Sequence, residues 1–260
     1  MFLQSRLKNS IFEIHVFKIN TFEDIFKLEI MRNLLNFIFL LFLTVGFSQS
    51  KYKTILSDID KDQESYTKIA QQIWSYAEMG YQEEQSSALL QKTLKEQGFQ
   101  IEAGVAEIPT AFVASYGSGS PVIAILGEYD ALPGLSQKAV PYKASNNGKA
   151  GHACGHHLFG TASAAAAIAI KNYLQKEGKS GTVKYFGCPA EEGGSGKVYM
   201  TRAGLFDEVD AALHWHADNK NAASIRPALA NKSAKFRFYG VSAHAAGAPE
   251  KGRSALDAVE

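Results

Sequence analysis

The chain has 260 residues, of which 46% are hydrophobic, and a formal net charge of +1. That length is enough for one large domain or two small ones with a buried core, and a charge this close to zero argues against nucleic acid as the main partner. Six of the seven histidines lie between residues 152 and 244, which is the first indication of a functional site.

The first 50 residues have the pattern of a secretory leader preceded by an extension. A short positive segment is followed by a nearly unbroken apolar run of 14 residues over 34–47, and 46–48 fits a signal-peptidase site. The run is too short for a membrane span of about 20 residues but suits a signal peptide. We expect a non-native extension over 1–30, a signal peptide over 31–50, and a periplasmic or secreted protein without stable membrane insertion. A buried helix or a membrane anchor is the alternative.

Helices and strands alternate over most of the remaining chain. Helices are expected over 62–97 with a break at Gly80, over 161–174 and over 196–203; strands are expected over 111–116, 122–127, 182–188 and 209–215. The second strand is apolar throughout, as for a strand buried on both faces. This order predicts an α/β domain over 51–228 with a mostly parallel sheet flanked by helices.

The pattern changes after Pro227. Polar and apolar residues alternate over 234–240, as in an antiparallel strand with one solvated face, and a helix opens within 252–260. We therefore expect a second domain, of α+β type, to begin at 229.

Four short segments carry the residue types of a metal site. They are Gly127–Asp130, His152–His157, Cys188–Glu192 and His214–His216. Three of them stand where a predicted strand ends, and in open α/β sheets functional sites gather at the carboxyl ends of strands. One thiol, several imidazoles and several carboxylates form the ligand set of a zinc-type site with mixed donors.

Cys154 and His156 are separated by one residue. Such positions lie on opposite sides of a helix, so both can contact one ion only from a loop, for which Gly151 and Gly155 supply the freedom. A thiolate there would also be stabilised by the N-terminus of the following helix. The alternatives are that Cys154 is a small buried residue, or that it pairs with Cys188 in the oxidising compartment that export implies.

Glu191 and Glu192 are adjacent acids that follow a predicted strand. On an extended chain their carboxylates would point in opposite directions, so that one can hold a metal while the other faces substrate. Hydrolysis by metal-activated water needs this division, because one carboxylate must move the water's proton to the leaving amine. Two solvated surface acids are the alternative. His214 and His216 share one face of a strand, and the pattern leaves open which of them binds.

Together, these segments resemble the amidohydrolase branch of the M20 metallopeptidase family over about 66–260. The matching motifs are Asp130-Ala-Leu-Pro, His152-Ala-Cys-Gly-His, Pro189-Ala-Glu-Glu and Ser242-Ala-His-Ala-Ala, and the continuation from His156 to Gly160 is most similar to the aminobenzoyl-glutamate hydrolases of that branch. The resemblance implies a zinc-peptidase-like catalytic domain over 51–228, then the truncated start of a lid and dimerisation domain over 229–260.

The resemblance also implies a role for each matched position. Two divalent ions, zinc or manganese, would be bound by four residues: Cys154 as the bridging ligand, His156, Glu192 and His216. Three further residues would take part in catalysis: Glu191 as general base, Asp130 as the residue that orients a ligand histidine, and His244 in the lid, which would polarise the scissile carbonyl across a homodimer.

The sequence departs from the branch in two respects. The branch usually has Asp at the position of His157 and often Asp at that of Glu128. In addition, the family's last histidine ligand follows the lid, and no residue of this chain matches it. We therefore expect this chain to be a fragment that is inactive alone.

The predicted function is metal-dependent hydrolysis of an amide bond in an N-acyl-amino acid, aminobenzoyl-glutamate or a dipeptide-like substrate. A degenerate, non-catalytic binding protein of the same fold is the alternative, although the matched ligand and base positions are intact. A disulfide-bonded protein without a metal site is a third possibility. A serine hydrolase is disfavoured because the sequence contains no G-x-S-x-G motif.

Overall fold

The computed structural model describes residues 22–223, 227 and 229–260, except for the side chains of 22–25 and 40–52. The chain divides into two compact units, the first ending at Ala217 and the second comprising Asp218–Glu260. The predicted domain boundary at 228 stays a prediction. So does the predicted extension over 1–30, most of which lies outside the described residues.

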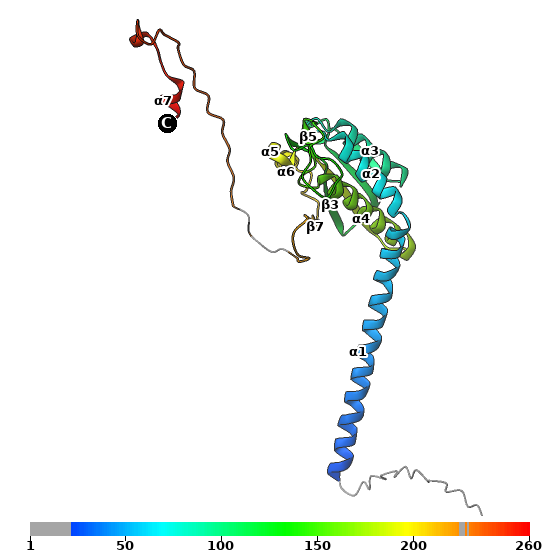
Figure 1. Ribbon diagram of the computed structural model, residues 1–260. Helices are drawn as coiled ribbons and strands as arrows, with labels where there is room; N and C mark the ends of the chain where they lie inside the picture. The colour runs from blue at the N-terminus through cyan, green and yellow to red at the C-terminus, as the bar shows by residue number, and fades with distance from the viewer. Residues whose placement is uncertain (1–21, 224–226, 228) are drawn as a thin grey trace, which may run out of the picture. The chain divides into compact units, whose positions relative to one another are not determined.

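The first unit contains the elements of an α/β domain (Figure 1). Its helices are α1 (Phe22–Lys61), α2 (Gln63–Tyr76), α3 (Glu84–Glu96), η1 (Val105–Glu107), α4 (His156–Glu177), α5 (Glu191–Gly194) and α6 (Gly196–Arg202). Its strands are β1 (Gln100–Ala103), β2 (Phe112–Ser118), β3 (Val122–Glu128), β4 (Leu132–Pro133), β5 (Ala150–Gly151), β6 (Gly181–Cys188) and β7 (Ala211–Leu213). The predicted helices and strands of this unit are present, although α4 begins at His156 rather than at Thr161.

The main sheet has the strand order β1-β2-β6-β3-β7. Strands β6, β3 and β7 run parallel, whereas β1 and β2 are antiparallel additions, so the sheet is mixed. Glu128 at the end of β3 is level with Cys188 at the end of β6. The polar segments that follow these two strands therefore start at the same edge of the sheet.

Both faces of the sheet are covered, as the apolar sequence of β3 predicts. Ile125 packs on one face in a core formed with α2, α3 and α4, and Ala124 packs on the other face with η1, α6 and Phe206. Because successive side chains of a strand point to opposite faces, β2, β3 and β6 each contribute to both cores. This double burial fixes the carboxyl ends of β3 and β6 in place.

Helix α4 approaches β3 unusually closely at Gly160. A Cβ atom at this position would lie 2.5 Å from the backbone oxygen of Glu128, so only glycine allows this approach. The hydroxyl of Tyr185, on β6, donates a hydrogen bond of 3.1 Å to the backbone oxygen of Gly160. The first turn of α4, which carries His156, is thereby held against the carboxyl edge of the sheet.

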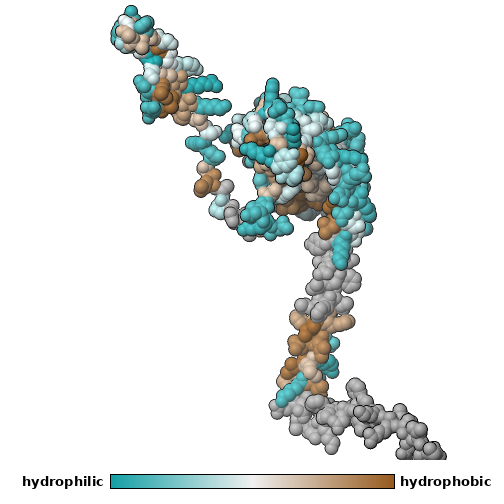
Figure 2. Space-filling view, viewed as in Figure 1, coloured by the Kyte–Doolittle hydropathy of each residue, from teal (hydrophilic) through white to brown (hydrophobic). Residues whose placement is uncertain are grey.

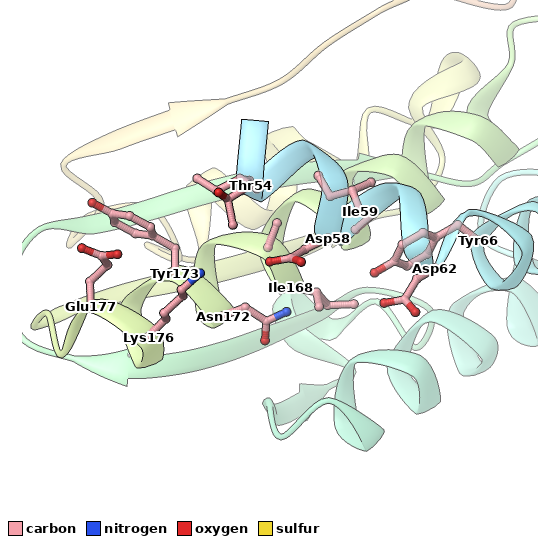
Figure 3. Close-up of a pocket in the computed structure, with 13 residues that line it drawn as sticks. Thr54, Asp58, Ile59, Asp62, Tyr66, Ile168, Asn172, Tyr173, Lys176 and Glu177 are labelled. Carbon is pink, nitrogen blue, oxygen red and sulfur yellow. The ribbon is translucent and has the colours of Figure 1, made fainter. Parts of the chain in front are cut away.

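The last turns of helix α1 pack beside α4. A small pocket of about 100 Å³ separates them, lined by Asp58, Tyr66 and Lys176 among others, and none of the predicted site residues reaches it (Figure 3). Apolar side chains over 26–39 are exposed (Figure 2). Among the described residues, no helix is long and apolar enough to cross a membrane. The predicted signal peptide over 31–50 falls within α1, and its cleavage stays a prediction.

The second unit contains little regular structure. It has a short 3-10 helix, η2 (Pro249–Lys251), and a helix, α7 (Ala255–Val259), in the region where a helix was expected. The predicted strand over 234–240 is wrong, since the described residues pair only Val241 with Arg253 there. A strand requires hydrogen bonds to a neighbouring strand, and alternation of side chains alone does not supply that neighbour.

Candidate metal-binding and catalytic site

His156 is completely buried at the start of α4. Its Nδ1 donates a hydrogen bond of 2.8 Å to the carboxylate of Asp130 and lies 3.0 Å from the backbone oxygen of the same residue. With the proton on Nδ1, the lone pair is on Nε2, which is buried and has no hydrogen-bond partner in the described part of the chain. An imidazole oriented by a carboxylate, with its second nitrogen free, is the arrangement of a metal-binding histidine.

Cys154 and His216 come from distant segments and meet beside His156. The Sγ atom of Cys154 lies 3.2 Å from Nε2 of His216, whose Nδ1 donates a hydrogen bond of 2.9 Å to the backbone oxygen of Ala217. One ligand atom from each of Cys154, His156 and His216 lies within 4.8 Å of the other two. Of the two candidate histidines, His216 therefore joins the predicted ligands, and both imidazoles present Nε2 to the same point.

Glu191 and Glu192 form the first turn of α5, and the expectation of an extended chain is wrong. The chain turns at Ala190, whose φ of 53° is left-handed. As a result both carboxylates face the site, with Oε2 of Glu191 at 3.8 Å and Oε1 of Glu192 at 4.0 Å from Nε2 of His156. The backbone N–H of Glu192 donates a hydrogen bond of 2.8 Å to Asp130, which thus holds both the ligand histidine and the acidic turn.

Glu128 is a buried carboxylate at the centre of the same cluster. Its Oε2 lies 3.2 Å from Nε2 of His156 and has no hydrogen-bond partner among the described residues, while its Oε1 contacts Lys197 and lies 3.2 Å from Nε2 of His214. Burial acts to raise the pKa of Glu128, but His214 and Lys197 outweigh it and lower the pKa to about 2. Glu128, His156 and Glu191 form a second possible ligand group.

The acids around Cys154 change the expected chemistry of its thiol. Burial first, and then the carboxylates of Glu192, Glu191 and Glu128, raise its pKa to about 11. The expectation that the helix dipole keeps a thiolate there is therefore wrong for the protein without ions, because the nearby negative charges outweigh a partial positive charge. The thiol, imidazole and carboxylate donors do fit a divalent cation, since Nε2 of His156 and Oε2 of Glu128 are buried and have no hydrogen-bond partner among the described residues. Binding of the cation would release the thiol proton.

The other cysteine, Cys188, and the neighbouring His152 have structural partners. Both cysteines are free, so the alternative of a disulfide between them is not met, and the buried thiol of Cys188 donates to the backbone oxygen of Phe186 at 3.3 Å. Nε2 of His152 donates a hydrogen bond of 3.0 Å to the backbone oxygen of Ile73. The pKa values of His152 and His157 are lowered to about 4, chiefly by burial, so both are neutral at pH 7.

His244 belongs to the second unit. Its imidazole is exposed, and Nδ1 accepts a hydrogen bond of 2.9 Å from the backbone N–H of Gly247. Nδ1 is therefore the acceptor, and the proton is on Nε2, which makes that nitrogen the available donor.

Glu83 is a residue of the site that the sequence analysis missed. Its side chain is completely buried, and its two oxygens accept hydrogen bonds from the backbone N–H of Ala190 at 2.7 Å and the hydroxyl of Thr110 at 3.0 Å. It thereby holds the left-handed turn that presents Glu191 and Glu192. In the sequence it stands in a run of polar residues, Gln82-Glu83-Glu84, which has the pattern of a solvated surface.

A family model and the most similar curated proteins point to the same group of peptidases and amide hydrolases. Residues 124–251 match peptidase family M20/M25/M40. One of the subunits of p-aminobenzoyl-glutamate hydrolase from Escherichia coli (strain K12) is 50% identical over 81% of this chain and 44% of its own length; the Xaa-Arg dipeptidase of Mus musculus is 32% identical over 77% and 46%. This chain thus spans less than half the length of these relatives.

Solved structures show the same fold. A dinuclear metal binding peptidase of the M20 family from Bacillus subtilis aligns with a TM-score of 0.50 and 26% identity, covering 61% of this chain and 44% of its own. An aminobenzoyl-glutamate utilization protein from Klebsiella pneumoniae aligns with a TM-score of 0.50 and 20% identity over 79% of this chain and 57% of its own. The mixed sheet flanked by helices is that of M20 catalytic domains.

Glu83→Ala should weaken metal binding, although Glu83 is not itself a proposed metal ligand. The substitution leaves the backbone N–H of Ala190 buried without an acceptor and frees the turn that carries Glu192. Loss of a residue that supports a metal ligand costs roughly 10- to 100-fold in affinity. A Co²⁺ titration that follows the thiolate charge-transfer band should show a fall in affinity of that order, whereas Glu83→Gln, which keeps an acceptor, should stay within a few-fold of wild type.

Glu78→Ala is the matched control for this experiment. The carboxylate of Glu78 also accepts backbone hydrogen bonds, from Gln85 and Ser86 at the start of α3. Its loss should lower the free energy of unfolding by about 1 kcal/mol, as for other helix caps, and leave Co²⁺ affinity unchanged. Equal Co²⁺ affinity in Glu83→Ala and wild type would show that the acidic turn does not depend on Glu83.

Proposed function

Because the chain carries a domain of peptidase family M20/M25/M40, we propose that the protein is a metal-dependent amidohydrolase. Its substrate would be an N-acyl-amino acid, an aminobenzoyl-glutamate or a dipeptide-like amide, in line with the names of its relatives. The observation that carries the proposal is the convergence of Cys154, His156 and His216, whose ligand atoms lie within 4.8 Å of one another, while the Nδ1 atoms of both histidines are held by oxygen atoms of the chain.

Four residues would hold two divalent ions, zinc or manganese: Cys154, His156, Glu192 and His216. The dinuclear metal peptidase from Bacillus subtilis supports a pair of ions. The buried, unpartnered Nε2 of His156 fits a site built for a cation. Ions bound there would supply Lewis-acid activation of water and of the scissile carbonyl.

The protein's own residues would position the reactants and move the proton. Asp130 keeps the proton of His156 on Nδ1 and fixes the backbone of Glu192. Glu191 would accept a proton from water and deliver it to the leaving amine. Its side chain is 44% exposed, against 21% for that of Glu192, and the base has to meet water and substrate. In the proposed homodimer, Nε2 of His244 from the other copy would donate a hydrogen bond to the carbonyl.

We also propose that the protein acts as a homodimer joined through the lid domain. The Escherichia coli relative is named as one subunit of its hydrolase, so an assembly with a different chain is the alternative. Native mass spectrometry of the protein from its own cell separates the two, because a homodimer has twice the mass of one chain and a mixed assembly does not.

Metal content tests the centre directly. We expect about two divalent ions per chain of the full-length protein after dialysis, measured by elemental analysis, since hydrolysis of this type uses paired ions. Cys154→Ser should lower the content more than Cys188→Ser, because the Cys188 thiol donates to the backbone oxygen of Phe186 and belongs to neither possible ligand group. Folded protein with almost no bound metal would contradict the proposal and favour a degenerate, non-catalytic binding protein.

Substitutions in the acidic pair should have different effects. Glu191→Gln keeps the size of the side chain but removes the base, so metal content should stay near wild type while kcat falls by roughly 10²- to 10⁴-fold. Glu192→Gln should instead lose metal, and excess ion should partly restore activity. The measurement is turnover of an N-acyl-amino acid or 4-aminobenzoyl-glutamate by the full-length protein, with metal analysis of the same samples. If neither change affected turnover, these acids would lie outside the mechanism.

Export is tested at the N-terminus. We propose that the apolar run over 34–47 directs secretion and that signal peptidase cleaves after it, which leaves a mature N-terminus near Gln49. Sequencing of the N-terminus of protein isolated from its own cell should find that residue. Recovery of residues 1–30 attached to soluble cytoplasmic protein would contradict the proposal.

A further inference from the structure

Glu128 and His156 bring two unpartnered atoms together inside the protein. Both side chains are almost completely buried. Oε2 of Glu128 lies 3.2 Å from Nε2 of His156, and neither atom has a hydrogen-bond partner among the described residues. Nε2 carries a lone pair, because the proton on Nδ1 is donated to Asp130, and a carboxylate oxygen is an acceptor only. Two such atoms at this distance repel each other unless a positive charge lies beside both.

The sheet and α4 fix the position of Glu128. It is the last residue of β3 and is level with Cys188 of β6. Gly160 of α4 packs so closely against its backbone oxygen that a Cβ atom on the glycine would lie 2.5 Å away. The carboxylate is therefore held at the edge of the sheet where the metal-binding cluster is formed.

Lys197 and His214 occupy the other oxygen of Glu128. The ammonium of Lys197 contacts Oε1, and Nε2 of His214 lies 3.2 Å from the same atom. Lys197 is the second residue of α6, which begins against the end of β6, since a Cβ atom on Gly196 would lie 2.1 Å from the backbone oxygen of Pro189. A carboxylate with one oxygen held by neighbours and the other free is oriented as a metal ligand is.

A third donor lies at the same position. Oε2 of Glu191 is 3.8 Å from Nε2 of His156, and one ligand atom from each of Glu128, His156 and Glu191 lies within 4.8 Å of the other two. The group that contains Cys154 and His216 shares His156 with this one. An ion at Nε2 of His156 thus has carboxylate oxygens in reach in addition to the thiol.

We propose that Glu128 is a further metal ligand, which binds through Oε2 the same ion as His156, and that Lys197 is the counter-ion that offsets its charge. Neither residue is among those to which the resemblance assigns a role, and Glu128 stands where the branch often has Asp. The inference rests on the proposed function and deepens it: one ion is held by a carboxylate of the sheet itself as well as by ligands from loops and helix starts.

Co²⁺ titration of the full-length protein, freed of metal by a chelator, tests the ligand. Glu128→Gln keeps the size of the side chain but removes its charge. Loss of a residue that only supports a metal ligand costs roughly 10- to 100-fold in affinity, so loss of a ligand should weaken at least one binding step by that much. Glu128→Asp keeps the charge but shortens the side chain by one carbon. It should also weaken binding, because a ligand has to touch the ion.

Lys197→Met tests the counter-ion. In the metal-free protein this change leaves the buried carboxylate of Glu128 with His214 alone, so Tm should fall, because a buried charge that loses its partner is unfavourable. A bound ion replaces the lost positive charge. Co²⁺ should therefore raise Tm by more in Lys197→Met than in wild type, and by less in Glu128→Gln.

Lys184→Met is the matched control. Lys184 is also a lysine of this unit in an ion pair, but its partner is the exposed Glu208, at 3.8 Å. The change should leave both the Co²⁺ affinity and the Co²⁺-induced rise in Tm as in wild type.

Two results would overturn the inference. Wild-type Co²⁺ affinity in Glu128→Gln would show that the carboxylate does not bind the ion, and wild-type affinity in Glu128→Asp alone would make it a distant charge. An equal Co²⁺-induced rise in Tm in Lys197→Met and wild type would overturn the role of Lys197, since the lysine and the ion would then not share one carboxylate.

Failure of this inference differs from failure of the proposed function. If the full-length protein hydrolyses amides and Glu128→Gln binds Co²⁺ as tightly as wild type, the function stands and Glu128 is not a ligand. If no amide is hydrolysed but both Glu128 variants bind Co²⁺ more weakly, the ligand stands and the function fails.

Discussion

The buried carboxylate of Asp130 joins three segments that are far apart in the sequence. One of its oxygens accepts the Nδ1 proton of His156, and the other accepts the backbone N–H of Glu192. It follows β3 directly, so its position depends on the sheet, while its two partners begin α4 and α5. A buried carboxylate with both oxygens paired keeps its hydrogen bonds in one geometry, since breaking either leaves an uncompensated charge. The directions of the ligand imidazole and of the acidic turn follow from this one group.

The sheet makes this arrangement possible and also makes it costly. Parallel pairing brings Glu128 level with Cys188, and the close approach at Gly160 sets α4 on the same edge. Several acids are then gathered in a small volume, and Lys197 and His214 offset only one of them directly. Burying charges without partners is unfavourable, so the fold tolerates this cluster best when further positive charge is bound. The clustered acids thus contribute to the raised pKa of the Cys154 thiol and also account for the proposed affinity for divalent ions.

Local patterns in the sequence predict most of the elements that position the site. The apolar run of β3, the helical spacing of α2 and α3, and the short distance between Cys154 and His156 depend on neighbouring residues, and the structure retains all of them. Features set by contacts between distant segments were not predictable. The antiparallel addition of β1 to the sheet depends on β2, and the role of Glu83 depends on Ala190, which is 107 positions away. The reversal of the chain at Ala190 likewise comes from such contacts, and so does the raised pKa of the Cys154 thiol.

Strand β7 ends the strand order of the main sheet, and all three of its residues are exposed. Within the described residues its outer edge has no strand partner, so backbone donors and acceptors face outward beside the exposed side chains of Leu213 and Trp215. An uncovered edge of this kind is a template for strand addition by any chain with a compatible backbone. Within the described residues, the backbone groups of β7 are thus open to pairing with a further strand.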